Sequence, residues 1–146
     1  MLRPATMDDV PAIELLVAAA YAVYVPRMGM QPKPMLDDYG RRVAAHQAWV
    51  VADTGVQAVL VMEDAADYLL VENVAVQPER QSQGLGGRLL AFAEEQARSR
   101  GYAELRLYTN ELMAENRAMY THLGYREVGR ESINGRRAVW FAKRVG

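Results

Sequence analysis

Three glycines lie close together in the segment QPERQSQGLGGRLL, residues 77–90, where an apolar helical stretch begins. The residues before it, YLLVENVAV at 68–76, are rich in the aliphatic side chains typical of a strand. A glycine-rich turn between a strand and a helix exposes backbone N–H groups, and the helix dipole favours negative charge beside them. The sequence therefore predicts a binding site for an anionic group such as a phosphate at this turn.

Two common phosphate-binding patterns do not fit this segment. The dinucleotide pattern G-x-G-x-x-G would need glycine at position 89, which is Leu89. The Walker pattern needs a lysine after its last glycine, and no lysine occurs between residues 34 and 142. The segment does contain Gln81-x-x-Gly84-x-Gly86, preceded by VAVQPER and followed by Gly87-Arg88-Leu89-Leu90.

This pattern resembles the acetyl-CoA loop of the GNAT superfamily of N-acetyltransferases, which is Q/R-x-x-G-x-G/A after the end of a V-x-P strand. The segment LYTNELMAENRAMYTHLGY, residues 107–125, is similar to a second element of that family, and the opening LRPATMDDVPAI resembles its usual start. The resemblance covers most of the chain. It implies an α/β fold with a mixed sheet whose central parallel strands splay apart. It also implies an acyltransferase that moves an acetyl group from acetyl-CoA directly to an amine.

The resemblance further implies which residues bind acetyl-CoA. Backbone N–H groups of residues 82–87 would hold the CoA pyrophosphate, because a loop with few side chains lets phosphates approach closely. Where the central strands splay, the N–H of Val74 would face the acetyl carbonyl oxygen, and Val76 would pair with the pantetheine arm. The full set expected to bind the cosubstrate is Val74, Val76, Gln81, Ser82, Gln83, Gly84, Leu85, Gly86, Gly87, Arg88, Asn116 and Tyr120.

Acetyl transfer from a thioester needs an N–H for the developing oxyanion, an acid for the leaving sulfur and a route for the amine proton. Asn116 and Tyr120 are four residues apart, so they share one face of the short helix expected there. A phenol with a pKa of about 10 is protonated at neutral pH and can donate to a thiolate. We therefore expect Tyr120 to be the catalytic acid, with a purely structural tyrosine as the alternative. Glu72 shares a strand face with Val74 and is the candidate base, with ordered water as the alternative.

Apolar periodicity and turn residues predict the elements that position these groups. Helices are expected from about residue 7 to 24, then at 36–47, 85–100 and 114–124, with a proline-containing loop at 25–35. Strands are expected at 2–6, 48–53, 56–63, 68–76, 103–110, 125–131 and 136–143. The turn signals Thr54-Gly55 and Asn134-Gly135 predict two hairpins among them. This order describes a mixed sheet with helices on its faces, in which the strands at 68–76 and 103–109 are parallel neighbours. We expect residues 1–146 to form a single N-acetyltransferase domain.

The composition narrows the class of protein. The chain is 51% hydrophobic and 24% charged, as in globular domains, and a net charge of −1 gives no footprint for nucleic acid. The absence of cysteine excludes disulfides, thiolate metal sites and an acyl-cysteine intermediate, and two unclustered histidines, His46 and His122, predict no metal site. The N-terminus lacks the apolar core of a signal peptide, and the longest apolar run is about half a bilayer span. These features predict a cytoplasmic protein without a membrane partner.

The acceptor is less well defined by the sequence. In this family the region between the first two helices walls the acceptor site, and here it is YVPRMGMQPKPMLDDYG, residues 24–40. Its acids suit a cationic amine and Arg27 suits a carboxylate, whereas a plain surface loop with Asp37 as a helix cap is the alternative. We expect a primary amine of a small molecule. A protein lysine or N-terminal amine as acceptor, and a non-catalytic CoA-binding module, are the competing hypotheses, and the sequence leaves a homodimer open.

Overall fold

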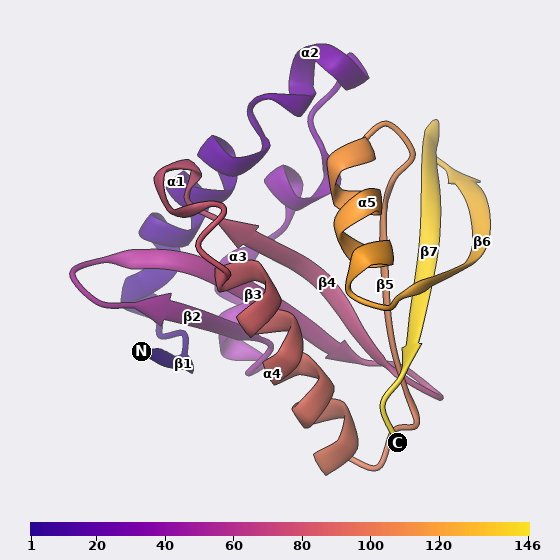
Figure 1. The fold of residues 1–146 in the computed structure, drawn as a ribbon. Coiled ribbons are helices and arrows are strands. Elements are labelled where there is room, and N and C mark those ends of the chain that lie inside the picture. The colour runs from indigo at the N-terminus through magenta and orange to yellow at the C-terminus, as the bar shows by residue number, and fades with distance from the viewer. The chain divides into compact units, whose positions relative to one another are not determined.

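The computed structural model describes all 146 residues as a mixed α/β fold (Figure 1). Its seven strands form one sheet in the order β1-β2-β3-β4-β5-β7-β6, which confirms the predicted fold class. The strands are β1 (Leu2–Pro4), β2 (Ala48–Ala52), β3 (Val56–Asp64), β4 (Leu69–Val76), β5 (Glu104–Asn110), β6 (Arg126–Ile133) and β7 (Arg136–Arg144). The α-helices are α1 (Val10–Tyr21), α2 (Tyr24–Met28), α3 (Tyr39–Ala44), α4 (Leu85–Ser99) and α5 (Ala114–His122).

The chain divides into two compact units. The first consists of Met1–Met62 with Glu72–Ala91, and the second of Glu63–Val71 with Phe92–Gly146. The elements β3, β4 and α4 therefore each have residues in both units. None of the helices combines the length and the apolar character needed to cross a bilayer.

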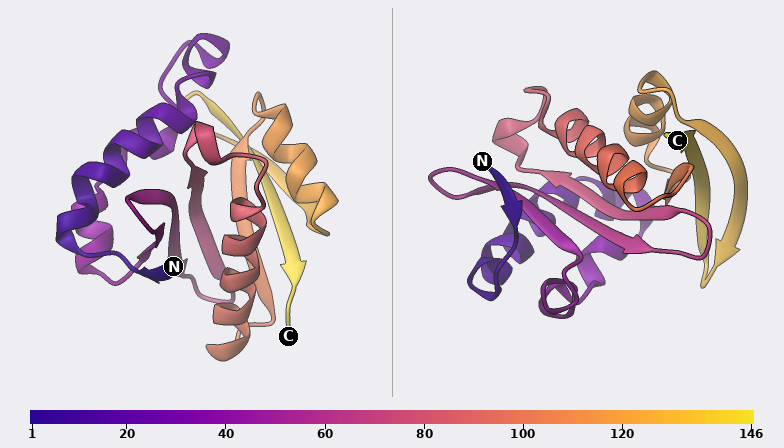
Figure 2. Two further views of the ribbon diagram at one scale, coloured as in Figure 1. Left: turned by 60° about the vertical axis from the view of Figure 1, so that its left-hand side comes forward. Right: turned by 90° about the horizontal axis from the view of Figure 1, so that it is seen from below.

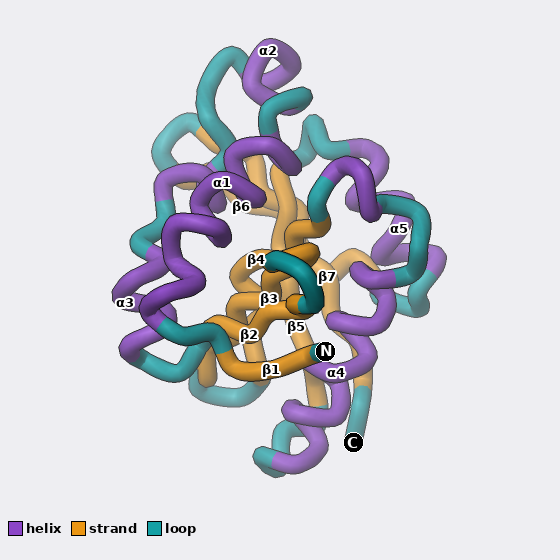
Figure 3. The backbone as a smooth tube through the Cα atoms, turned by 90° about the vertical axis from the view of Figure 1, so that its left-hand side faces the viewer, coloured by secondary structure: helices purple, strands orange, loops and turns teal.

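The first unit contains an antiparallel meander covered by helices. β1 pairs with β2 through Leu2 and Val51, and β2 pairs with β3 through the hairpin that the sequence predicts at residues 54–55. Helices α1 and α3 lie side by side on one face of these strands (Figures 2 and 3). The core residues of α1 are Ile13, Leu16 and Val17, which are at most 2% exposed, and Tyr21, which is 7% exposed.

The second unit is built on β5, β7 and β6. β5 runs antiparallel to β7, and β7 pairs with β6 through a tight turn at Asn134 and Gly135. Both turn residues have positive φ, 52° and 77°, as a two-residue hairpin loop of this type requires. Helix α5 packs against β7, where the rings of Tyr120 and Phe141 lie 5.8 Å apart (Figure 1).

The predicted parallel pair is present. Leu69 of β4 is in register with Leu105 of β5, and Val71 is in register with Leu107. Parallel neighbours need a long crossover, and α4 supplies it. The splay of the two strands beyond these residues stays a prediction.

The segment between α1 and α3 differs from the sequence-based prediction. The first helix ends at Tyr21, and the expected loop contains α2 and a 3₁₀ turn at Lys33–Leu36. Pro26 is compatible with a helix here because it lies in the first turn, where its missing N–H has no intrahelical acceptor. Gly29, with φ of 70°, then ends α2 in the left-handed conformation.

Candidate active site

The predicted phosphate loop lies between β4 and α4 in the first unit. Ser82 and Gly84 have left-handed backbones with φ of 68° and 84°, and α4 begins directly afterwards at Leu85. The amide of Arg88 donates to the carbonyl of Gly84 at 3.0 Å, so the N–H groups before it precede the first intrahelical bond. The turn therefore presents backbone donors at the positive end of a 15-residue helix.

Gly86 and Gly87 occupy the first turn of α4 although the fold does not require glycine at either position. Neither has a positive φ, and a Cβ atom added to either would meet no atom within 4 Å. Glycine destabilises a helix by roughly 0.5–1 kcal/mol relative to alanine. Nothing within the chain fills this space, and a phosphate group bound at the helix N-terminus fits it.

Two glutamine side chains connect the loop to the sheet by hydrogen bonds. Gln77 donates from Nε2 to the carbonyl of Val56 at 2.8 Å, and Gln81 donates from Nε2 to the carbonyl of Val76 at 3.3 Å. Gln81, which the family resemblance assigns to CoA binding, thus holds the loop in place here. Of the other loop side chains expected to bind CoA, those of Ser82, Gln83 and Arg88 are exposed and that of Leu85 is half-buried.

The side chains of β4 alternate between full and partial burial, so Glu72 and Val74 share one face as predicted, and Val76 lies on the same face. The carboxylate of Glu72, 10% exposed, faces two cations. Arg42 Nη2 lies 3.8 Å and Lys33 Nζ 3.9 Å from Glu72 Oε2. The carboxyl group of Glu72 therefore lies next to two cationic side chains.

Arg42 connects Glu72 to the segment that the family resemblance assigns to acceptor binding. It is 7% exposed, and it donates from Nε to Asp37 Oδ2 and from Nη1 to Gln47 Oε1, both at 2.9 Å. Asp38 accepts the backbone amide of the first turn of α3 at 3.0 Å. Asp37 and Asp38, the two acids considered for binding a cationic substrate, therefore already accept hydrogen bonds from Arg42 and from the amide of Arg41.

A buried hydrogen-bond network holds β4 at Val74. The hydroxyl of Tyr21 donates to Asn73 Oδ1 at 2.6 Å and lies 3.3 Å from the carbonyl oxygen of Val74. Asn73 donates from Nδ2 to the hydroxyl oxygen of Tyr39 at 3.0 Å, and Tyr39 donates to the carbonyl of Pro34 at 2.5 Å. The network therefore links α1, the segment before α3 and the strand that carries the expected oxyanion donor.

No motif of the sequence predicts this network. Asn73 is 5% exposed among the apolar side chains of β4. Because a buried amide requires hydrogen-bond partners, an asparagine at this strand position was the one sequence feature that indicated such a network. Its partners come from residues far away in the chain, which no local pattern reveals. Burial raises the pKa of Tyr39, and the nearby Asp37 carboxylate raises it further, so the phenol remains a donor.

Asn116 and Tyr120 lie on α5 in the second unit. Their spacing places them on one face of this helix, as expected. Asn116 donates from Nδ2 to the sulfur of Met113 at 3.6 Å. Tyr120 is 6% exposed, and its ring lies 6.0 Å from that of Tyr125. Their assignment to CoA binding and acid catalysis stays a prediction.

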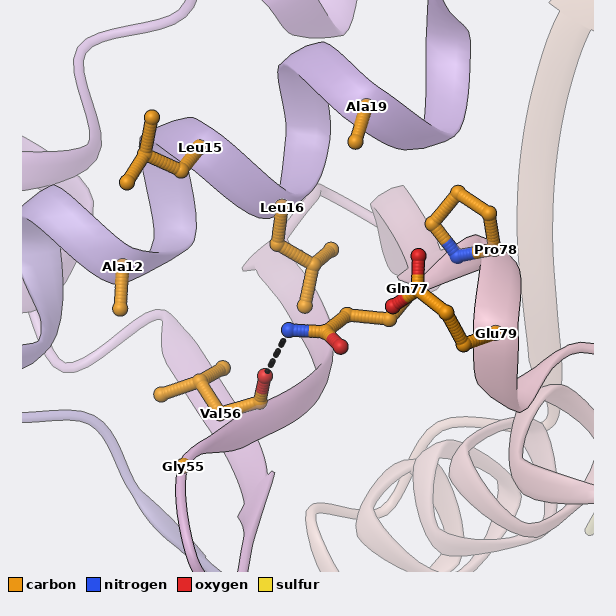
Figure 4. A pocket seen from close by; sticks show the side chains of 9 residues that line it. All are labelled: Ala12, Leu15, Leu16, Ala19, Gly55, Val56, Gln77, Pro78 and Glu79. Atoms are coloured by element: carbon orange, nitrogen blue, oxygen red, sulfur yellow. Dashed lines mark hydrogen bonds between the residues drawn. The ribbon is translucent and has the colours of Figure 1, made fainter.

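A groove of about 310 Å³ lies beside the start of the loop, between the outer face of α1 and residues 77–79 (Figure 4). Alanine and leucine side chains of α1 form one wall, and the bond from Gln77 to Val56 crosses the other. None of the predicted site residues lines this groove. We therefore assign none of the expected chemistry to this groove.

Comparison with known proteins identifies the family. The family model described as the acetyltransferase (GNAT) domain matches residues 44–127, more than half of the chain. The chain belongs to the GNAT acetyltransferase family. The protein is therefore an acetyl-CoA-dependent acyltransferase, and this confirms the family and the enzyme class predicted from the sequence. No curated protein matches this acetyltransferase.

Solved structures share the fold of this acetyltransferase at low sequence identity. PaiA N-acetyltransferase from Thermoplasma acidophilum, solved with coenzyme A, is 15% identical with a TM-score of 0.81, and 99% of this chain and 98% of that chain align. The ribosomal-protein-S18-alanine N-acetyltransferase from Escherichia coli is 21% identical with a TM-score of 0.74, covering 99% and 93%. Nourseothricin acetyltransferase is 23% identical with a TM-score of 0.61, and the match covers 68% of this chain and 64% of that chain.

Proposed function

We propose that the protein transfers the acetyl group of acetyl-CoA directly to a primary amine of a small molecule, with residues 1–146 acting as one catalytic domain. The observation that carries the proposal is the open space above Gly86 and Gly87 in the first turn of α4. Helix-destabilising residues at a helix N-terminus, with no internal reason for them, fit the binding of the CoA pyrophosphate. Ser82, Gln83, Leu85 and Arg88 would border the same phosphates.

The proposed reaction uses three groups of the chain. The backbone N–H of Val74 stabilises the oxyanion as the amine attacks the thioester carbonyl. Glu72, or a water that it holds, accepts the proton of the amine. Tyr120 protonates the departing thiolate. Val76 pairs with the pantetheine arm and Asn116 contacts CoA, as the family resemblance implies.

The compact conformation of residues 24–40 supports a small acceptor. The bonds from Tyr39 to Pro34 and from Arg42 to Asp37 fix this segment as short helical turns, which suits a compact ligand better than an extended peptide. The structure neighbours include an acetyltransferase named for nourseothricin and one named for a ribosomal protein. The acceptor class is therefore tested by following thiol release from acetyl-CoA with panels of small primary amines and of peptides.

The loop assignment is tested with Gly86→Ala. Because the added Cβ meets nothing within 4 Å, alanine should stabilise α4, by roughly 0.5–1 kcal/mol. The same methyl group would occupy the space proposed for a phosphate, so the dissociation constant for acetyl-CoA should rise at least about tenfold, which corresponds to about 1.4 kcal/mol. Melting temperature and calorimetric affinity are measured on one preparation.

The matched control is Gly129→Ala. Gly129 lies in β6, and a Cβ there also meets no atom within 4 Å. This variant should leave acetyl-CoA affinity unchanged. If Gly86→Ala binds acetyl-CoA as tightly as the parent protein, the pyrophosphate does not lie on this turn.

A further inference from the structure

Lysine is nearly absent from this chain. Of its 17 basic residues only Lys33 and Lys143 are lysines, and the others are arginines. This matters for an acetyltransferase because a lysine amine can attack a thioester once it loses its proton, whereas arginine stays protonated. The protein therefore contains two side-chain amines that its own reaction can modify.

Lys143 is held by several groups of the second unit. Its Nζ donates to the carbonyl of Leu123 at 3.0 Å and to Glu94 Oε2 at 3.2 Å, and it lies 5.5 Å from the ring centroid of Tyr125. These contacts occupy the Nζ atom of Lys143, and no proposed catalytic group is among them. Lys143 therefore serves as an internal reference for an unreactive amine.

Lys33 lies beside the proposed base. Its Nζ is 3.9 Å from Glu72 Oε2, and its side chain is 61% exposed while that of Glu72 is 10% exposed. Glu72 and Val74 share one face of β4, and two residues of a strand span about 7 Å. The amine of Lys33 therefore lies beside the proposed proton acceptor, whose strand also carries the proposed oxyanion donor, all within the first unit.

Resting on the proposed function, we propose that Lys33 is a self-acetylation site of this enzyme. The ammonium of Lys33 gives a proton to Glu72, and the free amine forms a bond to the acetyl carbonyl carbon. The carbon–sulfur bond of acetyl-CoA breaks, and the thiolate leaves as CoA thiol after taking up a proton. The net products are Nε-acetyl-lysine at position 33, CoA and one proton released to solvent. Acetylation removes the charge of Lys33, which ends its ion pair with Glu72 and leaves Arg42 as the cation there.

The test incubates the purified full-length protein with acetyl-CoA alone and measures acetylation by mass spectrometry. Trypsin does not cleave between Lys33 and Pro34, so residues 28–41 form one peptide in both the modified and the unmodified state. Lys33 should be acetylated at least about 10²-fold faster than Lys143, the lower end of what general base catalysis supplies. The first-order rate should not depend on protein concentration, because the step occurs within one chain.

Glu72→Gln and urea-unfolded protein are the controls. Glu72→Gln keeps the shape of the side chain and removes the proton acceptor, so acetylation of Lys33 should fall about 10²-fold while the fold, checked by circular dichroism, persists. In urea both lysines should react with acetyl-CoA at the same slow rate. Equal rates for the two lysines in the native protein, no effect of Glu72→Gln, or a rate proportional to protein concentration would each overturn the proposal.

Lys33→Arg separates this inference from the proposed function. Arginine keeps the positive charge and provides no amine for acetylation. If Lys33→Arg releases thiol with an external amine while Lys33 of the parent protein stays unmodified, only the self-acetylation proposal is wrong. If neither Lys33 nor any external amine is acetylated although acetyl-CoA binds, the transfer function itself is wrong.

Discussion

At the residue scale, the carbonyl of Pro34 fixes the orientation of the Asn73 side-chain amide through two successive hydrogen bonds. The carbonyl of Pro34 can only accept, so the hydroxyl of Tyr39 must donate to it, at 2.5 Å. Tyr39 therefore accepts from the NH₂ group of Asn73, which directs the amide oxygen of Asn73 toward Tyr21. The proton of Tyr21 goes to that oxygen at 2.6 Å rather than to the carbonyl of Val74 at 3.3 Å. All donors then point in one direction, an arrangement in which successive hydrogen bonds strengthen one another.

Tyr120→Phe tests the proposed acid at the same scale. The ring contacts with Tyr125 and Phe141 should remain, because phenylalanine keeps the ring. We expect kcat to fall about 10²–10⁴-fold, the usual contribution of general acid catalysis. The affinity for acetyl-CoA should change little, since the proton is needed only once charge develops on sulfur. The measurements are steady-state rates with an identified acceptor and calorimetric binding.

Tyr125→Phe is the matched control for this prediction. Tyr125 belongs to the same aromatic cluster and is 3% exposed, but no catalytic role is proposed for it. Its loss of a hydroxyl should leave kcat near that of the parent protein. If Tyr120→Phe is also fully active and only its melting temperature changes, Tyr120 is a structural residue.

At the element scale, the junction between β1 and α1 depends on one carboxylate. Asp9 accepts from Arg3 Nη1 at 2.7 Å, from Arg3 Nη2 at 3.0 Å and from the amide of Thr6 at 2.8 Å. The hydrogen bonds from the Arg3 guanidinium are the main reason that the pKa of Asp9 falls to about 2. Because the folded-state pKa lies below the unfolded-state value, stability from this group is present above the unfolded pKa of about 3.9 and is lost as pH falls toward 2.

Asp9→Asn should therefore lower the free energy of unfolding near neutral pH and have no effect in strong acid. The expected loss is about 1–2 kcal/mol at pH 7, less than the full pKa shift would give, because Arg3 is 36% exposed and solvent screens the pair. Urea unfolding between pH 2 and 7 measures the difference between the two proteins. Asp8→Asn, at the exposed neighbouring position, is the control. A difference that does not diminish below pH 4 would contradict the assignment.

The sequence predicts most elements, because apolar spacing and turn residues determine them locally. The hairpins at residues 54–55 and 134–135 and the parallel pairing of β4 with β5 are confirmed. Helix α2 was missed because Pro26 and Gly29 suggest a loop, although one is compatible with a helix start and the other with a helix end. The pairing of Arg42 with Glu72 was also missed. Its partners are far apart in the chain, and only the folded structure brings them together.

At the scale of the whole molecule, three elements run through both compact units. β3, β4 and α4 each have residues in the first and the second unit, so the chain passes between the units three times. If one unit unfolded alone, each of these strands and this helix would be cut short in the other unit and would lose part of its hydrogen bonds. We therefore expect the two units to unfold together rather than as separate domains.

Acetyl-CoA should raise the melting temperature of the whole chain in one transition. A ligand that binds only the folded state at 100 times its dissociation constant stabilises it by about 2.7 kcal/mol, which is roughly 5–10 °C for a chain of this size. Acetyl-pantetheine, which lacks the pyrophosphate, should have a much smaller effect at the same concentration. Calorimetry with both ligands measures this. Equal shifts with both ligands would show that the pyrophosphate contributes nothing.

The use of arginine rather than lysine in the ion pairs affects how this protein responds to slow chemical acylation. Arginine provides the cation in the pairs with Asp9, Glu95, Asp64, Glu104, Glu111 and Glu127. Guanidinium groups do not react with thioesters, so slow chemical acylation during long exposure to acetyl-CoA leaves these pairs intact. Among the side chains, only the amines of Lys33 and Lys143 are open to such acylation. A stored preparation should therefore separate into few charge variants on isoelectric focusing, and its surface electrostatics should outlast those of a lysine-rich protein in the same solution.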